Sequence, residues 1–136
     1  MGTLVKFPTA KLLKEKGYNE QCGMLFNENG VPSGTKMSMG GNPNNYINKY
    51  SAPTIDDVKW WLYRKHGIWI TVETLGNEND YPKFDYKAVT LKDSNSDVDW
   101  LMKRLDISYE ELIAKSYNNP IEAYEAAIEY VLNNLI

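Results

Sequence analysis

The clearest candidates for nucleophilic chemistry are the single cysteine, Cys22, and the single histidine, His66. A thiol becomes an effective nucleophile when a base lies within hydrogen-bond distance, so a Cys–His hydrolase would need the fold to bring these two residues together. His66 stands at the expected end of a helix, where an imidazole compensates the helix dipole. No Cys, Asp or Glu lies near it at the spacing of metal ligands. We therefore expect a structural histidine, with no catalytic site and no metal site.

Two loops contain part of a ligand-binding motif. Residues 30–36, GVPSGTK, have the glycines of a phosphate-binding loop, but the threonine precedes the lysine and no helix follows, whereas the nucleotide motif needs Lys before Ser or Thr. Residues 93–97, DSNSD, have the acidic spacing of a calcium loop, but Val98 and Arg104 stand where glycine and glutamate are needed. We expect a hairpin loop and a helix cap here, and no cofactor.

Three pairs of neighbouring carboxylates are candidates for acid–base chemistry. The pairs are Asp56 with Asp57, Asp97 with Asp99, and Glu110 with Glu111. Each pair falls in the first turn of an expected helix, where negative charge stabilises the helix dipole. Helix capping therefore explains these residues more economically than catalysis does.

The clearest local signals in the chain surround a central helix. Thr54 can cap its start, and Asp57 stands where the acid of a capping box reaches back. Basic residues at 64–66 suit the negative end of the helix, and Gly67 supplies the left-handed residue that ends it. Residues 68–72 then alternate between apolar and other side chains, which predicts a strand with one apolar face.

The helical periodicity separates this helix into a buried stripe and an outward face. The expected stripe comprises Ile55, Val58, Trp61 and Leu62. Trp60 and Tyr63 lie off the stripe, and Trp69 falls on the strand face opposite the apolar residues. Two tryptophans therefore face away from the first core. Either the C-terminal helices of the same chain cover them, or a partner does.

The same outward aromatic residues are interleaved with basic ones. The set comprises Tyr46, Trp60, Tyr63 and Trp69 with Lys59, Arg64 and Lys65. Interfaces between proteins favour Trp and Tyr, whereas single-strand nucleic-acid binders combine stacking rings with a basic groove. No RNP-like motif accompanies these residues. We expect a protein-interaction surface, with single-stranded nucleic-acid binding as the alternative.

The N-terminal part predicts a short helix over 8–16 and a strand around 22–28. Asn29-Gly30 is a favoured hairpin turn, so we expect a returning strand over 31–39, although Pro, Ser and Gly interrupt it.

The rest of the chain predicts a loop, a hairpin and a helical region. Residues 40–50, rich in Gly and Asn, predict a long loop. A strand over 84–90 is expected to pair with 68–74. Further helices are expected over 96–105, over 108–116 and from Pro120 onward, each after a Ser or Asn cap. Together these elements predict one α+β domain over 1–136, with a small antiparallel sheet of about four strands, a central helix packed on it and a helical C-terminal third.

Composition narrows the class of protein further. The chain has 136 residues, 43% of them hydrophobic and 24% charged, which is typical of a globular domain with its own core. The net charge of −3 argues against a protein that mainly grips phosphates. A single cysteine allows no intramolecular disulfide, and neither a membrane-spanning run nor a signal-peptide core is present. We expect a cytoplasmic protein with no membrane partner.

Three blocks of the sequence resemble a known group of proteins. The central block has the letters APT at 52–54, WL at 61–62 and HGI at 66–68. It resembles the core A-P-T-x-x-x-[LV]-x-x-W-L-x-x-x-H-G-I of small uncharacterised proteins encoded in phages, prophages and bacterial genomes. The opening, 7–22, and the closing block, 120–132, are similar to those of the same group. Residues 93–116 depart from its shorter members and look like an inserted helical pair.

The resemblance implies a phage-derived or mobile-element origin and assigns no reaction. Together with the outward tryptophans, it predicts a non-enzymatic accessory protein that binds another protein or itself, for example as a homodimer.

Overall fold

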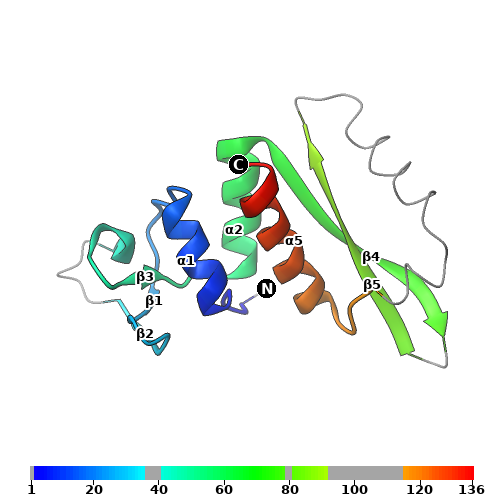
Figure 1. Cartoon of the computed structure of the whole chain (residues 1–136), viewed down its shortest axis with the longest axis horizontal. Coiled ribbons are helices and arrows are strands. Elements are labelled where there is room, and N and C mark those ends of the chain that lie inside the picture. The colour runs from blue at the N-terminus through cyan, green and yellow to red at the C-terminus, as the bar shows by residue number, and fades with distance from the viewer. Residues whose placement is uncertain (1, 36–40, 79–80, 92–114) are drawn as a thin grey trace.

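The computed structural model describes residues 2–35, 41–78, 81–91 and 115–136 (Figure 1). Within these residues the chain has the expected α+β architecture, with three α-helices and two antiparallel sheets. The strands are divided between a three-stranded sheet and a separate two-stranded hairpin, where the sequence predicted one sheet of about four strands. The helices expected at 96–105 and 108–116, with the calcium-like loop before them, lie outside the described residues except for 115 and 116.

The N-terminal half consists of a helix and a small sheet. Helix α1 (Phe7–Glu15) has a proline in its first turn, where a missing N–H costs no helical hydrogen bond. Strand β1 (Met24–Phe26) lies between β2 (Pro32–Gly34) and β3 (Tyr50–Ser51), and both pair with it antiparallel. Strand β2 thus consists of the Pro-Ser-Gly residues that were expected to interrupt the returning strand, and residues 36–39 of the expected 31–39 lie outside the described residues.

The turn between β1 and β2 confirms the predicted Asn-Gly signal. Gly30 has φ +79°, a left-handed conformation that residues with a Cβ rarely adopt. A Cβ at this position would lie 2.7 Å from the Phe7 ring. Gly30 is thus required both by the turn and by the close approach of helix α1.

The central helix has the predicted start and end. Helix α2 (Ile55–Trp61) opens with a capping box, in which Thr54 and Asp57 each accept the other's backbone N–H at 3.2 Å. The helix continues as a π-helical turn, η3 (Leu62–His66), which Gly67 ends at φ 63°, ψ 31°. Gly67 turns the chain directly into the long hairpin.

The hairpin forms the second sheet. Strand β4 (Ile68–Glu78) pairs antiparallel with β5 (Tyr81–Thr90), with Ile70 opposite Ala88 and an irregularity between Thr74 and Asn77. Helix α5 (Pro120–Asn134) packs against both strands, and Ile68, Ile70 and Ala88 are buried. The opposite face of the hairpin carries Trp69.

Helices α1 and α5 lie side by side and run parallel. The backbone N–H of Lys6 donates to Glu125 Oε1 at 2.9 Å, and Thr9 Oγ1 donates to Glu129 Oε1 at 3.2 Å. Partner numbers rise together along both helices, which defines the direction. The carboxylate of Glu125 also lies at the N-terminus of α1, where the helix dipole favours negative charge.

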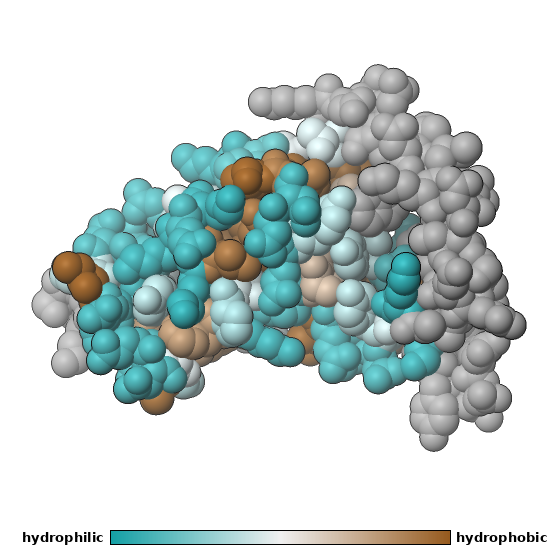
Figure 2. All heavy atoms as spheres, in the orientation of Figure 1, coloured by the Kyte–Doolittle hydropathy of each residue, from teal (hydrophilic) through white to brown (hydrophobic). Residues whose placement is uncertain are grey.

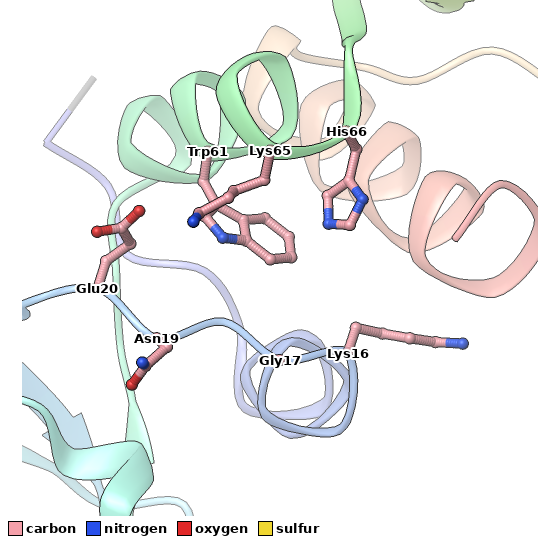
Figure 3. Close-up of a pocket in the computed structure, with 7 residues that line it drawn as sticks. All are labelled: Lys16, Gly17, Asn19, Glu20, Trp61, Lys65 and His66. Atoms are coloured by element: carbon pink, nitrogen blue, oxygen red, sulfur yellow. The ribbon is translucent and has the colours of Figure 1, made fainter.

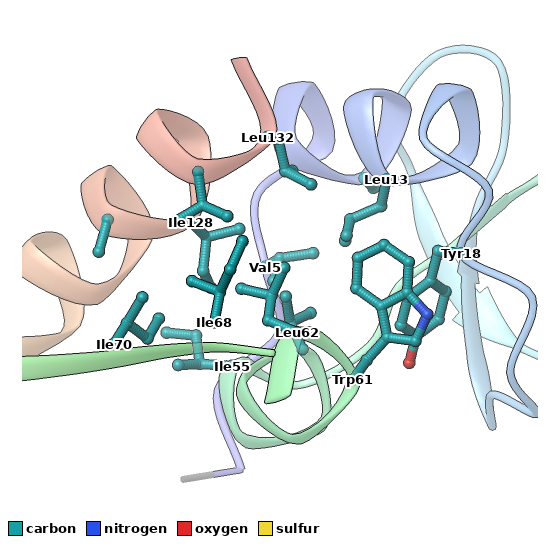
Figure 4. Close-up of a cluster of buried hydrophobic side chains, with 14 of the residues drawn as sticks. Val5, Leu13, Tyr18, Ile55, Trp61, Leu62, Ile68, Ile70, Ile128 and Leu132 are labelled. Atoms are coloured by element: carbon teal, nitrogen blue, oxygen red, sulfur yellow. The ribbon is translucent and has the colours of Figure 1, made fainter. Parts of the chain in front are cut away.

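One core joins these elements. Its largest fully buried side chains come from the N-terminal segment, α1, α2, the π-helical turn, β4 and α5 (Figure 4). They include Val5, Leu13, Ile55, Trp61, Leu62, Ile68, Ile70, Ile128 and Leu132. On the face seen in Figure 2, hydrophilic residues surround a hydrophobic band near the upper ends of α2 and α5. None of the helices in the described ranges combines the length and apolar character that crossing a bilayer requires.

Candidate functional site

Three of the residues singled out in the sequence form one aromatic cluster on the surface. We define the aromatic cluster as Trp60, Tyr63 and Trp69. The ring centroids lie 5.4 Å apart for Trp60 and Trp69, 5.9 Å for Trp60 and Tyr63, and 5.8 Å for Tyr63 and Trp69. Trp60 is 50% exposed and Tyr63 46% exposed. The cluster therefore presents a large ring surface to solvent.

Local structure explains why these rings meet. Trp60 and Tyr63 are three residues apart, a spacing that places side chains on the same side of a helix. Gly67 then reverses the chain, and its N–H donates to the Tyr63 carbonyl at 3.1 Å. Strand β4 leaves this turn with Trp69 on its outward face, so the indole returns to the two helical rings.

The three rings pack against one another and leave no space for a ligand between them. Its rings are tilted by 58° to 88° and contact one another directly, as aromatic pairs prefer. At centroid distances below 6 Å, no cation or other group fits between them. A ligand of this cluster must lie on it, as the apolar part of a polypeptide does at an interface.

Lys59 connects the cluster to helix α5. Its ammonium lies 5.4 Å from the Trp69 ring centroid and 4.7 Å from that of Tyr124, within the range of cation–π attraction. Helix α5 thus reaches one edge of the cluster through Tyr124 and leaves Trp60 half exposed. The sequence left open whether the C-terminal helices or a partner cover the outward tryptophans. Helix α5, the C-terminal helix that the structure describes, does not cover Trp60.

The other basic residues do not line a common groove. Arg64 lies 3.9 Å from Glu20, and both side chains are substantially exposed. Lys65 lines a hollow that also contains Glu20. Lys59 is engaged with rings, Arg64 lies near a carboxylate and Lys65 shares a hollow with one, an arrangement that weakens a phosphate-binding surface.

Tyr46 belongs to a different part of the molecule. It follows the 3-10 turn η2 (Pro43–Asn45), which packs against β3. Its backbone carbonyl accepts from the Lys14 ammonium at 2.7 Å. The prediction that Tyr46 shares a surface with the other aromatic residues is thus not supported by its position.

Two hollows lie between residues 16–21 and the end of the central helix. The first, which we call the His66 hollow, has a volume of about 370 Å³; Trp61, Lys65 and His66 face the segment from Lys16 to Glu20 across it (Figure 3). The second, the Tyr18 hollow, has a volume of about 390 Å³. It is lined by Tyr18, Glu20, Gln21, Asp57, Trp60 and Arg64. Trp60 belongs to both this hollow and the aromatic cluster.

Sequence reasoning missed the Tyr18 hollow. The residues 18–21 follow a helix-ending glycine and carry no motif, and they meet α2 only through the tertiary fold. A buried tyrosine followed by charged and amide side chains gives no signal of its own.

Cys22 and His66 have separate environments. The Cys22 thiol donates to the Met24 carbonyl at 3.1 Å, and burial raises the pKa of Cys22. His66 packs edge-on against Trp61, with centroids 4.8 Å apart, and burial and then Lys65 lower its pKa. A raised thiol pKa is the opposite of what activates a cysteine nucleophile. Across the described ranges, His, Cys, Asp and Glu nowhere form a group of three or more that could hold a metal ion.

The loop that shares glycines with phosphate-binding motifs is part of the small sheet. Residues 32–34 form β2, and the Thr35 hydroxyl donates to the Cys22 carbonyl at 2.7 Å. The hydroxyl that would bind a metal in a nucleotide site is thus engaged with the backbone.

No protein-family model, curated protein or solved structure matches this chain. Function is therefore inferred from the geometry of the surface itself.

Proposed function

We propose that this protein is a non-enzymatic accessory protein of phage or prophage type, which acts in the cytoplasm and binds another polypeptide through the aromatic cluster. The single observation that carries the proposal is the contact between three surface rings, two of them about half exposed. A second copy of this chain is one candidate for that polypeptide.

The cluster has the properties of an interface anchor. Tryptophan and tyrosine contribute much of the binding energy at protein interfaces because they bury a large area and lose few rotamers. Ring–ring contacts and the Lys59 ammonium hold Trp69 in place before a partner arrives. A preformed anchor lowers the entropic cost of association.

Single-stranded nucleic acid is the competing ligand for the same rings. Exposed rings stack on bases, but such binders add a continuous basic groove. Here Glu20 lies beside Arg64 and lines the same hollow as Lys65, so we favour a polypeptide. A fluorescence titration with a mixed-sequence oligonucleotide at low salt is expected to show no saturable quenching. Saturable quenching that weakens with added salt would move the assignment to nucleic acid.

The test of the proposal compares substitutions inside and outside the cluster. Tagged wild-type chain, Trp60→Ala, Tyr63→Ala and Ile47→Ala are purified from the cells that naturally contain the protein, and co-purifying polypeptides are quantified. Ile47 is a matched control because it is an apolar side chain, 89% exposed, outside the cluster. We expect each cluster variant to reduce capture of a partner by about tenfold or more, and Ile47→Ala to leave it unchanged.

Light scattering behind size exclusion over a wide concentration range distinguishes the two kinds of partner. Self-association that Trp60→Ala abolishes identifies a second copy. If folded Trp60→Ala and Tyr63→Ala proteins capture and self-associate as the wild type does, the proposal is wrong.

A further inference from the structure

The Tyr18 hollow lies beside the aromatic cluster and shares Trp60 with it. A polypeptide bound on the cluster at Trp60 is therefore adjacent to this hollow. Its volume of about 390 Å³ is at the small end of the range for ligand pockets. A single long side chain is an occupant of suitable size.

Tyr18 supplies a hydroxyl group to the lining of this hollow. The residue as a whole is only 3% exposed, but it lines the hollow. Burial raises the pKa of Tyr18 most, and Cys22, Asp57 and Glu20 raise it further, whereas Arg64 lowers it. The hydroxyl thus faces the charged side chains that line the hollow. A phenolic hydroxyl can donate or accept a hydrogen bond, so it can pair with a ligand bound in the hollow.

The charge of the hollow favours a cation. Two carboxylates, of Glu20 and Asp57, line it with one guanidinium, of Arg64. Asp57 Oδ2 accepts from the Thr54 backbone, which leaves its second oxygen for a ligand. The balance of formal charges is therefore negative.

Arg64 does not close the hollow. Its guanidinium is 3.9 Å from Glu20, and the side chains are 56% and 37% exposed. Such an exposed ion pair is weak. An incoming cation can therefore share the Glu20 carboxylate with Arg64 or displace the Arg64 guanidinium from it. Its position also shows that a guanidinium fits beside Glu20.

We propose that the Tyr18 hollow receives a cationic side chain, arginine or lysine, from the polypeptide that binds the aromatic cluster. The Trp60 ring contacts the cation and its aliphatic stem, the Glu20 and Asp57 carboxylates pair with the charge, and the Tyr18 hydroxyl accepts a hydrogen bond. The proposal rests on the proposed function and narrows the partner to one with a basic residue beside its apolar anchor.

The test uses three end-blocked tripeptides: Gly-Arg-Gly, Gly-citrulline-Gly and Gly-Glu-Gly. Binding is followed by NMR at the indole N–H of Trp60 and the ring of Tyr18. Citrulline keeps the shape of arginine and removes its charge. We expect Gly-Arg-Gly to bind most tightly and to be weakened about two- to fivefold by Glu20→Gln or Asp57→Asn, as for a solvent-accessible ion pair. Glu28→Gln, an exposed acid on the β1–β2 turn, serves as the matched control and should change nothing.

Asp57→Asn keeps an oxygen for the capping box, and denaturant unfolding verifies that each variant is folded. Equal affinity for the arginine and citrulline peptides, or a preference for the glutamate peptide, overturns the proposal. Tyr63→Ala distinguishes it from the proposed function, because Tyr63 belongs to the cluster and does not line the hollow. If Tyr63→Ala and Trp60→Ala leave capture of a partner unchanged while Gly-Arg-Gly binds selectively, the proposed function fails and the cation site stands. If capture depends on the cluster but the peptides bind without selectivity, the cation site alone fails.

Discussion

Lys59 stabilises the position of a ring in the aromatic cluster. Its ammonium lies between the rings of Trp69 and Tyr124, so a residue of α2 joins β4 to α5. The long aliphatic stem of a lysine can cover apolar surface while its charge stays near rings and water. Lys59, which the sequence placed among the basic residues of a nucleic-acid surface, therefore helps to hold the Trp69 ring against helix α5.

His66 provides a prediction about pH. Burial, and to a smaller extent Lys65, lower its pKa from the ordinary value of 6.5. The unfolded chain therefore takes up a proton more readily than the folded one. The stability that neutral His66 contributes is complete above 6.5 and is lost as the pH falls from there to the folded pKa. Denaturant unfolding between about pH 5 and about pH 8 should show this loss in the wild type and less of it in His66→Gln.

NMR can check the cause directly, because His66 is the only histidine in the chain. Lys65→Gln should raise the pKa of His66 while leaving it below 6.5, since burial is the larger cause. A folded-state pKa of His66 at or above 6.5 would contradict this account of its environment.

At the scale of elements, the capping box of α2 can be tested directly by mutation. Thr54→Ala removes the hydroxyl that accepts the Asp57 N–H and should lower the free energy of unfolding by about 1 kcal/mol. Thr54→Ser keeps the acceptor and should lose much less. Urea unfolding followed by tryptophan fluorescence measures both variants. Equal stability of Thr54→Ala and the wild type would mean that the cap contributes nothing.

The elements that the sequence predicted well are those with local signals. The start of α2 at its capping box, its end at Gly67 and the Asn119 cap of α5 all follow from residues next to each other in the chain. The division of the strands into two sheets does not, because β1 pairs with β3, which is more than twenty residues away in the sequence, with β2 and η2 between them. Likewise, the parallel contact of α1 with α5 depends on Glu125 meeting Lys6 in space.

At the scale of the whole molecule, the fold determines which outward residues become a site. Periodicity alone placed Trp60 and Trp69 away from the core. In the structure both belong to one cluster, in which Trp60 is exposed and Trp69 is half-buried. Their mutual contact depends on the path of the chain after Gly67, which periodicity does not encode. Tyr46 was grouped with these rings from the sequence, but it follows η2, which packs against strand β3 of the other sheet. The Tyr18 hollow arises only where residues 18–21 meet α2.

Site-specific photo-cross-linking directly tests whether the aromatic cluster binds a polypeptide. A photoreactive phenylalanine analogue is placed at position 60, 63 or 47 of the full chain, in the cells that naturally contain the protein. We expect a discrete, nuclease-resistant adduct with a polypeptide from positions 60 and 63, and little or none from position 47, whose apolar side chain is 89% exposed and lies outside the cluster. The adduct mass then identifies either a second copy or another chain. Adducts that are as strong from position 47, or that disappear on nuclease treatment, would contradict the assignment of the aromatic cluster as a protein-binding surface.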